Sequence, residues 1–138
     1  MGIVESVEIR IETGSTGRAI DITTQAVDFC RNKGDGLLSV FVPHATAGLA
    51  IFETGAGTDG DVMEAIDDLL PRDMGRWRHE HGTPGHGRDH VLPAFISPSL
   101  TVPVLGGNLQ LGTWQSLVLV DTNVDNPVRK VRLSFLPG

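Results

Sequence analysis

The sequence predicts an α+β fold, a β-sandwich-like arrangement of mixed sheets that carries two main helices. Two observations predict this class: segments with strand-like patterns outnumber helix-like ones, and they gather toward both ends of the chain. A doubly wound parallel sheet would instead require strands and helices to alternate. The length of 138 residues, without repeats or a linker, predicts a single domain over residues 1–138.

The first third of the chain predicts two strands and a helix. Apolar and charged residues alternate over 7–12, which is typical of a half-buried strand. A turn at 14–18 leads to a short second strand at 19–22. We expect a helix that begins with Thr23 as its N-cap and ends at Gly34.

The middle of the chain predicts two buried strands and a second helix. The apolar runs at 37–42 and 48–52 have strand length, and Pro43 interrupts the chain between them. The pair Asp61 and Glu64 resembles a capping box at the start of a helix that ends at Pro71.

The segment from Arg72 to Arg88 is polar and rich in Gly and His, which predicts a long loop of the kind that often serves function. The chain then becomes β-rich again. Gly106 and Gly107 predict a hairpin turn. We expect four further strands, at 100–104, 108–112, 114–121 and 128–135.

Composition and charge exclude several classes of function. The net charge of −6 argues against a nucleic-acid partner, whose phosphates require a basic surface. No apolar run is long enough to cross a membrane, and the N-terminus lacks the pattern of a signal peptide. The single cysteine, Cys30, cannot form an internal disulfide and fits a reducing compartment, so a cytoplasmic location is expected.

The histidines indicate where chemistry takes place. Four of the five lie within 79–90, and the fifth, His44, follows Pro43 at a strand end. His79 and His81 are two apart, so both point the same way in an extended segment. Three imidazoles, or two and a carboxylate, would make an open zinc-type site. The alternative is a solvated loop with incidental histidines, because no standard zinc spacing is present.

Two further features are candidates for ligand contacts. Glu53 ends an apolar strand beside a Gly-rich loop, where Asp59 and Asp61 follow. These two aspartates equally fit a role at a helix N-terminus. Residues 55–60 match the dinucleotide-binding pattern G-x-G-x-x-G, but the negative charge of the aspartates argues against a dinucleotide site. Trp114 and Gln115 could stack on and hydrogen-bond a ring, or Trp114 could fill the core.

The order of several short motifs resembles the YjbQ-like family, described as secondary thiamine-phosphate synthase enzymes. Individually the motifs are weak, and together they cover nearly the whole chain. They are IDIT (20–23), FVPHATAGLAIFE (41–53), LLPRD (69–73), WRH (77–79), DH (89–90), SPSLTVPV (97–104) and GGNLQLGTWQ (106–115).

The resemblance implies a compact α+β domain assembled as a homotrimer that binds a small molecule. It implies catalytic residues at His44, Glu53, His79 and His90, and a divalent metal, zinc or magnesium, on the three histidines. Substrate contacts are expected from Thr46, Asp59, Trp114 and Gln115. The loop after Glu53 departs from the family pattern, because the asparagines that flank this acid and a following proline are missing.

Three functions follow from these features. The first is the transferase that the family description implies, which joins a pyrimidine pyrophosphate to a thiazole phosphate; Trp77 or Trp114 would stack on the ring. The second is a histidine-metal hydrolase or lyase with Glu53 as general base. The third is a non-catalytic trimer that binds a metal or a small metabolite.

Overall fold

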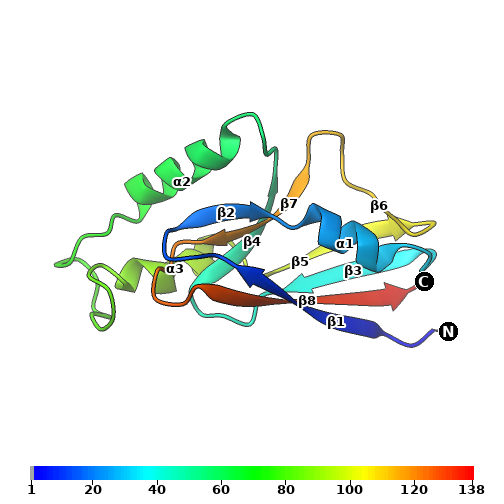
Figure 1. Cartoon of the computed structure of the whole chain (residues 1–138), viewed down its shortest axis with the longest axis horizontal. Helices are drawn as coiled ribbons and strands as arrows, with labels where there is room; N and C mark the ends of the chain where they lie inside the picture. Colours follow the sequence, from blue (N-terminus) through cyan, green and yellow to red (C-terminus); the bar gives the residue numbers. More distant parts are fainter. Residues whose placement is uncertain (1) are drawn as a thin grey trace.

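The structure is a computed structural model that describes residues 2–138, and in this range the chain forms three helices and eight strands (Figure 1). The helices are α1 (Thr23–Cys30), α2 (Thr58–Leu69) and α3 (Gly87–Phe95). The strands are β1 (Glu5–Glu12), β2 (Arg18–Asp21), β3 (Gly36–Phe41), β4 (Ala47–Phe52), β5 (Ser99–Leu105), β6 (Asn108–Leu109), β7 (Ser116–Asp121) and β8 (Val128–Pro137).

The strands form two sheets, one of five strands in the order β1-β8-β3-β5-β6 and one of three in the order β2-β7-β4. The predicted α+β class and sandwich-like layering are confirmed. The expectation of mixed sheets was wrong, because every strand pairing in residues 2–138 is antiparallel. The main core lies between the sheets and includes Leu38 and Leu133 from one and Leu49 and Leu119 from the other.

A second core lies on the other face of the small sheet. Along β7, Leu117 and Leu119 belong to the main core, whereas Val118 and Val120 pack with residues of α2 and α3. Both faces of β7 are therefore buried, which explains its unbroken apolar run. Figure 1 shows α2 and α3 together at the end of the molecule opposite the two termini.

The third helix, α3, corrects the prediction of two main helices. Residues up to Arg88 were expected to form a loop, but the helix begins at Gly87. Gly87 and Pro93 are poor helix formers, so local propensity gives little indication of a helix here. Its stability comes from tertiary burial, because Leu92 is buried in the second core and Asp89 is fully buried in ion pairs.

The helix starts also differ from those expected. Thr23 is the first residue of α1 rather than its N-cap, and its Oγ1 accepts a hydrogen bond from Leu117 N. Helix α2 begins at Thr58, and its N-cap is Gly57, whose φ of 97° suits glycine. Asp61 therefore lies within the first turn of the helix and does not form the expected capping box. The Gly106–Gly107 turn is confirmed, because both residues have positive φ and join paired strand ends.

No helix in residues 2–138 is long and apolar enough to cross a membrane.

Candidate metal centre

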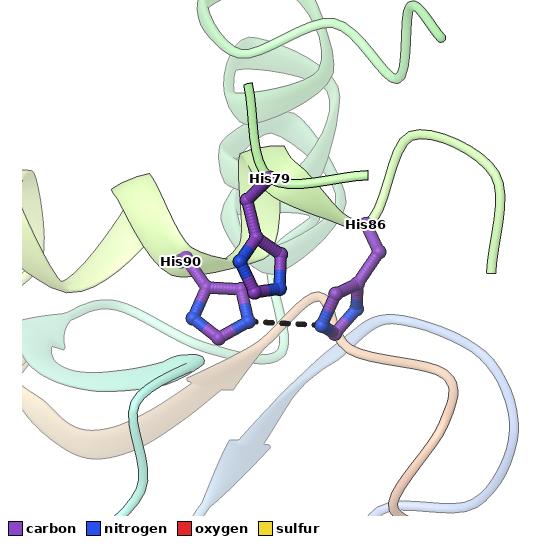
Figure 2. Close-up of side chains that lie close together, drawn as sticks. All are labelled: His79, His86 and His90. Atoms are coloured by element: carbon purple, nitrogen blue, oxygen red, sulfur yellow. Dashed lines mark hydrogen bonds between the residues drawn. The ribbon is translucent and has the colours of Figure 1, made fainter. Parts of the chain in front are cut away.

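Three histidine side chains meet at the start of α3. His86 lies one residue before the helix and His90 one turn further on, so both rings project from the same face. Their Nε2 atoms are 2.9 Å apart. His79 comes from the preceding loop, and its ring centroid is 4.1 Å from that of His90 and 5.4 Å from that of His86 (Figure 2). One nitrogen from each ring lies within 4.8 Å of the other two.

Close backbone approach holds the loop that carries His79 against α3. A Cβ on Gly87 would overlap the Trp77 side chain and the His79 carbonyl oxygen, so only glycine allows this contact. Trp77 Nε1 donates a hydrogen bond to Pro71 O at 2.9 Å, which anchors the loop at its start. His79 therefore has a defined position although its segment has no regular secondary structure.

Buried ion pairs hold the helix beneath the histidines. Asp89 is fully buried, and its Oδ1 accepts hydrogen bonds from Arg72 Nη2 at 3.1 Å and from Thr122 Oγ1 at 2.7 Å. Arg88 bonds Asp67 and the carbonyl of Leu70 and so ties α3 to α2. Arg72 and Arg88 are thus both engaged by groups of the protein itself.

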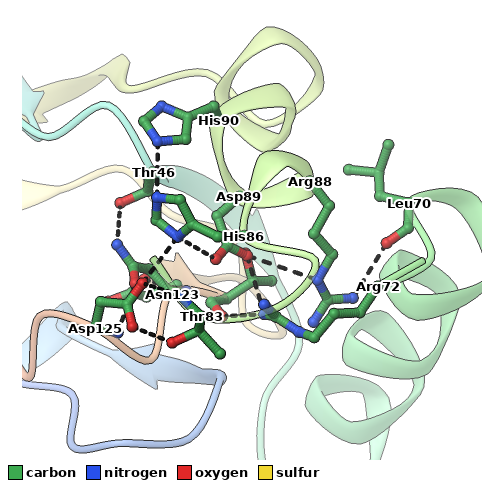
Figure 3. A network of polar contacts seen from close by, with 12 residues as sticks. Thr46, Leu70, Arg72, Thr83, His86, Arg88, Asp89, His90, Asn123 and Asp125 are labelled. Carbon is green, nitrogen blue, oxygen red and sulfur yellow. Dashed lines mark hydrogen bonds and ion pairs between the residues drawn. The ribbon is translucent and has the colours of Figure 1, made fainter. Parts of the chain in front are cut away.

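The second ring nitrogen of His86 faces two carboxylates (Figure 3). His86 Nδ1 is 3.0 Å from Asp125 Oδ2 and 3.3 Å from Asp89 Oδ2. It lies between the two oxygens without a well-aligned hydrogen bond to either. Thr83 donates to Asp125 through both its backbone N and its Oγ1, and these bonds lower the pKa of that carboxyl group. A carboxylate behind a histidine ring is the usual outer-shell arrangement at metal sites.

The environment favours neutral imidazoles at this cluster. Loss of hydration, followed by the neighbouring histidines, lowers the pKa of His79 and that of His90. A neutral ring keeps a lone pair on one nitrogen, which is the form that binds a metal. His79 Nε2 is buried without a hydrogen-bond partner in the described part of the chain.

The arrangement fits a tetrahedral transition-metal ion better than magnesium. Zn–N bonds of about 2.0–2.1 Å place two imidazole nitrogens roughly 3.3 Å apart in a tetrahedral site. The nitrogens of His86 and His90 are 2.9 Å apart, which is shorter than this value. The limit of 4.8 Å that contains all three nitrogens is longer than it. Imidazole donors suit zinc, copper, iron and nickel, whereas magnesium prefers oxygen ligands.

The structure brings His79 and His90 together but groups them with His86 rather than with His44. His44 Nε2 accepts a hydrogen bond from Lys130 N at 2.9 Å, beside β8. Thr46 is buried, where its Oγ1 accepts from Arg129 Nη2 at 2.7 Å and from Asn123 Nδ2 at 2.9 Å. Asn123 Oδ1 in turn accepts from Asp125 N, so Thr46 is connected to the histidines through the 121–125 segment.

The other predicted residues lie at the opposite end of the small sheet. Thr46 and Glu53 flank the two ends of β4, about 23 Å apart at roughly 3.3 Å per residue. Asp59 is in the first turn of α2, which agrees with the helix-terminus alternative. Trp114 is 72% exposed, so it is not a core residue, and Gln115 Oε1 accepts from Gly112 N.

Sequence reasoning did not assign His86, Asp89 or Asp125 to the site. The spacing of His86 and His90 by four residues is a signal for a shared helix face, but it has that meaning only once the segment is known to be helical. Asp125 is distant in sequence, so the strand pairing that brings it near is needed to find it. His79 and His81, which were expected to point the same way in an extended segment, have ring centroids 3.9 Å apart although the segment is not a strand.

Comparisons with known proteins agree with this fold. The family model described as UPF0047 protein YjbQ-like matches residues 7–138. A UPF0047 protein of Mycobacterium tuberculosis H37Rv is 61% identical over 121 residues, which cover 88% of this chain and 90% of the relative. A solved structure of a hypothetical protein from Aeropyrum pernix K1 has a TM-score of 0.86 at 31% identity, covering 97% of this chain and 99% of that one.

A solved YbjQ-like protein of unknown function from Sulfolobus solfataricus P2 has a TM-score of 0.90 at 24% identity and covers 99% of each chain, which supports the fold alone.

Proposed function

We propose that this chain, which belongs to the UPF0047 YjbQ-like family, binds a zinc-type divalent metal through His79, His86 and His90 and uses it in a hydrolase or lyase reaction on a small molecule. One observation carries the proposal: three imidazole nitrogens converge within 4.8 Å. Three protein ligands leave the fourth position of a tetrahedral ion open, as in catalytic rather than structural zinc sites. When bound, the metal would supply a Lewis acid that polarises a substrate oxygen.

The surroundings of His79 favour a small substrate. A cavity of about 120 Å³ borders this histidine and is lined by Met74, Trp77, His79, Glu80, Pro84 and Gly85. Trp77 offers an apolar wall whose position is fixed by its bond to Pro71 O. Glu80 is exposed at the same cavity and is the acid best placed there for proton transfer. Glu53, expected from the sequence as the base, lies at the other end of β4.

The transferase implied by the family resemblance receives less support from the geometry. Release of pyrophosphate requires positive charge on the leaving group. Of the four arginines in residues 72–88, Arg72 and Arg88 are engaged by Asp89 and Asp67, and Arg76 lies over the Trp77 ring. Trp114, one of the two proposed stacking residues, lies outside the cluster. We therefore place metal-assisted hydrolysis or lysis ahead of thiamine-phosphate synthesis, and a non-catalytic metal-binding protein remains the alternative without turnover.

Elemental analysis of the purified, untagged protein tests the metal centre. We expect close to one transition-metal ion per chain, lost in the His86→Ala, His90→Ala double variant and retained in His44→Ala, the matched control. Loss in His44→Ala as well, with retention in His86→Ala alone, would instead support the ligand set expected from the sequence, which contains His44 and not His86. A wild-type protein that takes up no metal after dialysis against zinc would refute the proposal.

The homotrimer also belongs to this proposal. Within one chain, Glu53, Trp114 and Gln115 lie at the end of the small sheet opposite Thr46, away from the histidines. A neighbouring subunit could bring that end of the small sheet to the metal. Light scattering coupled to size exclusion would give the subunit number. If it is three, mixed trimers of Glu53→Gln and His86→Ala chains would show, by recovered turnover, that the site is shared.

A further inference from the structure

The chemistry of the cluster depends on which nitrogen of His86 carries the proton. His86 is only 7% exposed, so protein groups rather than bulk water decide this. Its Nε2 faces His90 Nε2 at 2.9 Å, and its Nδ1 faces Asp125 and Asp89. A metal ligand needs the lone pair on the nitrogen that points toward the other two histidines.

We propose that Asp125, together with Asp89, keeps the proton of His86 on Nδ1 and thereby leaves the Nε2 lone pair directed at the metal position. Asp125 is thus a positioning residue for the centre. This inference deepens the proposed function, because the metal is what uses the free lone pair. The position of the proton can nevertheless be measured in the metal-free protein.

Repulsion excludes the opposite tautomer. With the proton on Nε2, the Nδ1 lone pair of His86 would point at two carboxylate oxygens 3.0 and 3.3 Å away, with no proton between them. With the proton on Nδ1, it lies between both oxygens and His86 Nε2 accepts a hydrogen bond from His90 Nε2–H. Of the two neutral tautomers, only this one satisfies every close contact of the ring.

The two carboxylates contribute differently. Asp125 is oriented by three bonds, since Thr83 donates to its carboxylate twice and its own backbone N donates to Asn123 Oδ1 at 2.7 Å. Asp89 Oδ2 is buried without an aligned donor, so it adds negative potential at Nδ1. Because Asp89 also anchors Arg72, removing it would disturb the fold. Asp125 is 35% exposed and is the position where the effect can be isolated.

The test combines histidine nitrogen NMR with metal affinity. In the metal-free wild type, at about pH 8, we expect His86 as the Nδ1–H tautomer. In Asp125→Ala, we expect a larger share of the Nε2–H form and a loss of zinc affinity of about 10- to 100-fold in competition with a chelator. Asp73→Ala is the control, because that acid only accepts a bond from Gly75 N in an exposed turn.

The outcomes separate the two claims. A wild-type His86 in the Nε2–H form, or an Asp125→Ala variant with unchanged tautomer and affinity, would overturn the inference even if zinc binds. An Nδ1–H tautomer that shifts in Asp125→Ala, in a protein that binds no zinc, would sustain the positioning role while the metal proposal fails. Asp125→Asn checks folding, since it keeps the size of the side chain.

Discussion

His86 and His90 face each other through their Nε2 atoms at 2.9 Å, and in the metal-free protein one of them must donate to the other. A bound cation would replace this shared proton as the group between the two rings. Metal binding to such a preformed pair needs little movement of α3. It should therefore stabilise the folded chain by an amount that grows with the logarithm of its affinity.

Metal removal should thus lower thermal stability. At free zinc about 100 times its Kd, binding contributes about 2.7 kcal/mol to the free energy of unfolding. We expect the Tm measured by calorimetry to fall by several degrees on chelation and to recover on adding zinc. His86→Ala should show the same lower Tm with and without zinc. An equal zinc response in wild type and variant would place the metal elsewhere.

The buried pair Arg129 and Asp121 predicts a large loss of stability when one partner is removed. Arg129 is 2% exposed and binds Asp121 through Nε at 2.7 Å and Nη2 at 2.9 Å. Arg129→Met leaves the Asp121 carboxylate buried without its cation, which costs about 3–5 kcal/mol. Urea unfolding measures this loss.

The matched control is Arg10→Met, because the Arg10–Glu12 pair is exposed on both sides and should contribute at most about 1 kcal/mol. The double variant Arg129→Met, Asp121→Leu should recover much of the loss. Similar effects of the two single arginine variants would contradict the role of the buried pair.

His44 predicts a pH dependence of stability that is separate from the metal site. Burial, followed by the charge of Arg129, lowers its pKa below the ordinary value of 6.5. The unfolded chain therefore binds a proton at this position before the folded chain does, and stability falls as the pH drops below about 6.5. Protonation of Nε2 would also break the bond from Lys130 N.

His44→Gln keeps an acceptor for Lys130 N without a titrating group. Urea midpoints of the metal-free proteins between about pH 5 and pH 7.5 should fall less steeply for this variant than for the wild type. His79 and His90, whose pKa values are also lowered, act in the same direction in both proteins and cancel in the comparison. Equal slopes would show that His44 does not contribute.

The strands could be predicted because their periodicity is local. Alternation over 7–12 and the apolar runs of β3, β4 and β7 indicate strands whatever the rest of the chain does. Helix α3 could not be predicted in this way, because Gly87 and Pro93 disfavour a helix. The helix is stabilised instead by the burial of Leu92 and Asp89 against distant segments of the chain.

Part of the candidate site could also be predicted because its signal is local in the sequence. His79 and His90 were found because the histidines crowd one stretch of sequence. His44 and Glu53 were added because each lies at the end of a predicted strand and because the family resemblance implies them. An extended strand, however, separates its two ends by the greatest distance, so β4 places Glu53 away from the end where Thr46 lies.

Substitution of Gly87 tests how strongly the metal centre depends on the packing of the loop that carries His79. A methyl group there would overlap Trp77 and the His79 carbonyl oxygen, so Gly87→Ala must push the 77–79 segment away from α3. His86 and His90 remain in place on the helix, while His79 moves out of reach. We expect zinc affinity to fall at least about 10-fold, because loss of an outer-shell partner alone costs about 10- to 100-fold, while the strands stay intact.

Gly75→Ala is the matched control, because the atom nearest an added Cβ there is 3.7 Å away, an ordinary contact. Chelator competition gives the affinity, and circular dichroism checks that the sheets persist. Unchanged affinity in Gly87→Ala would mean that His79 is not needed as a ligand, and the centre would then consist of His86, His90 and a group from outside the cluster. A fall in affinity confined to Gly87→Ala would instead show that the third ligand is held in place by backbone contact rather than by the helix.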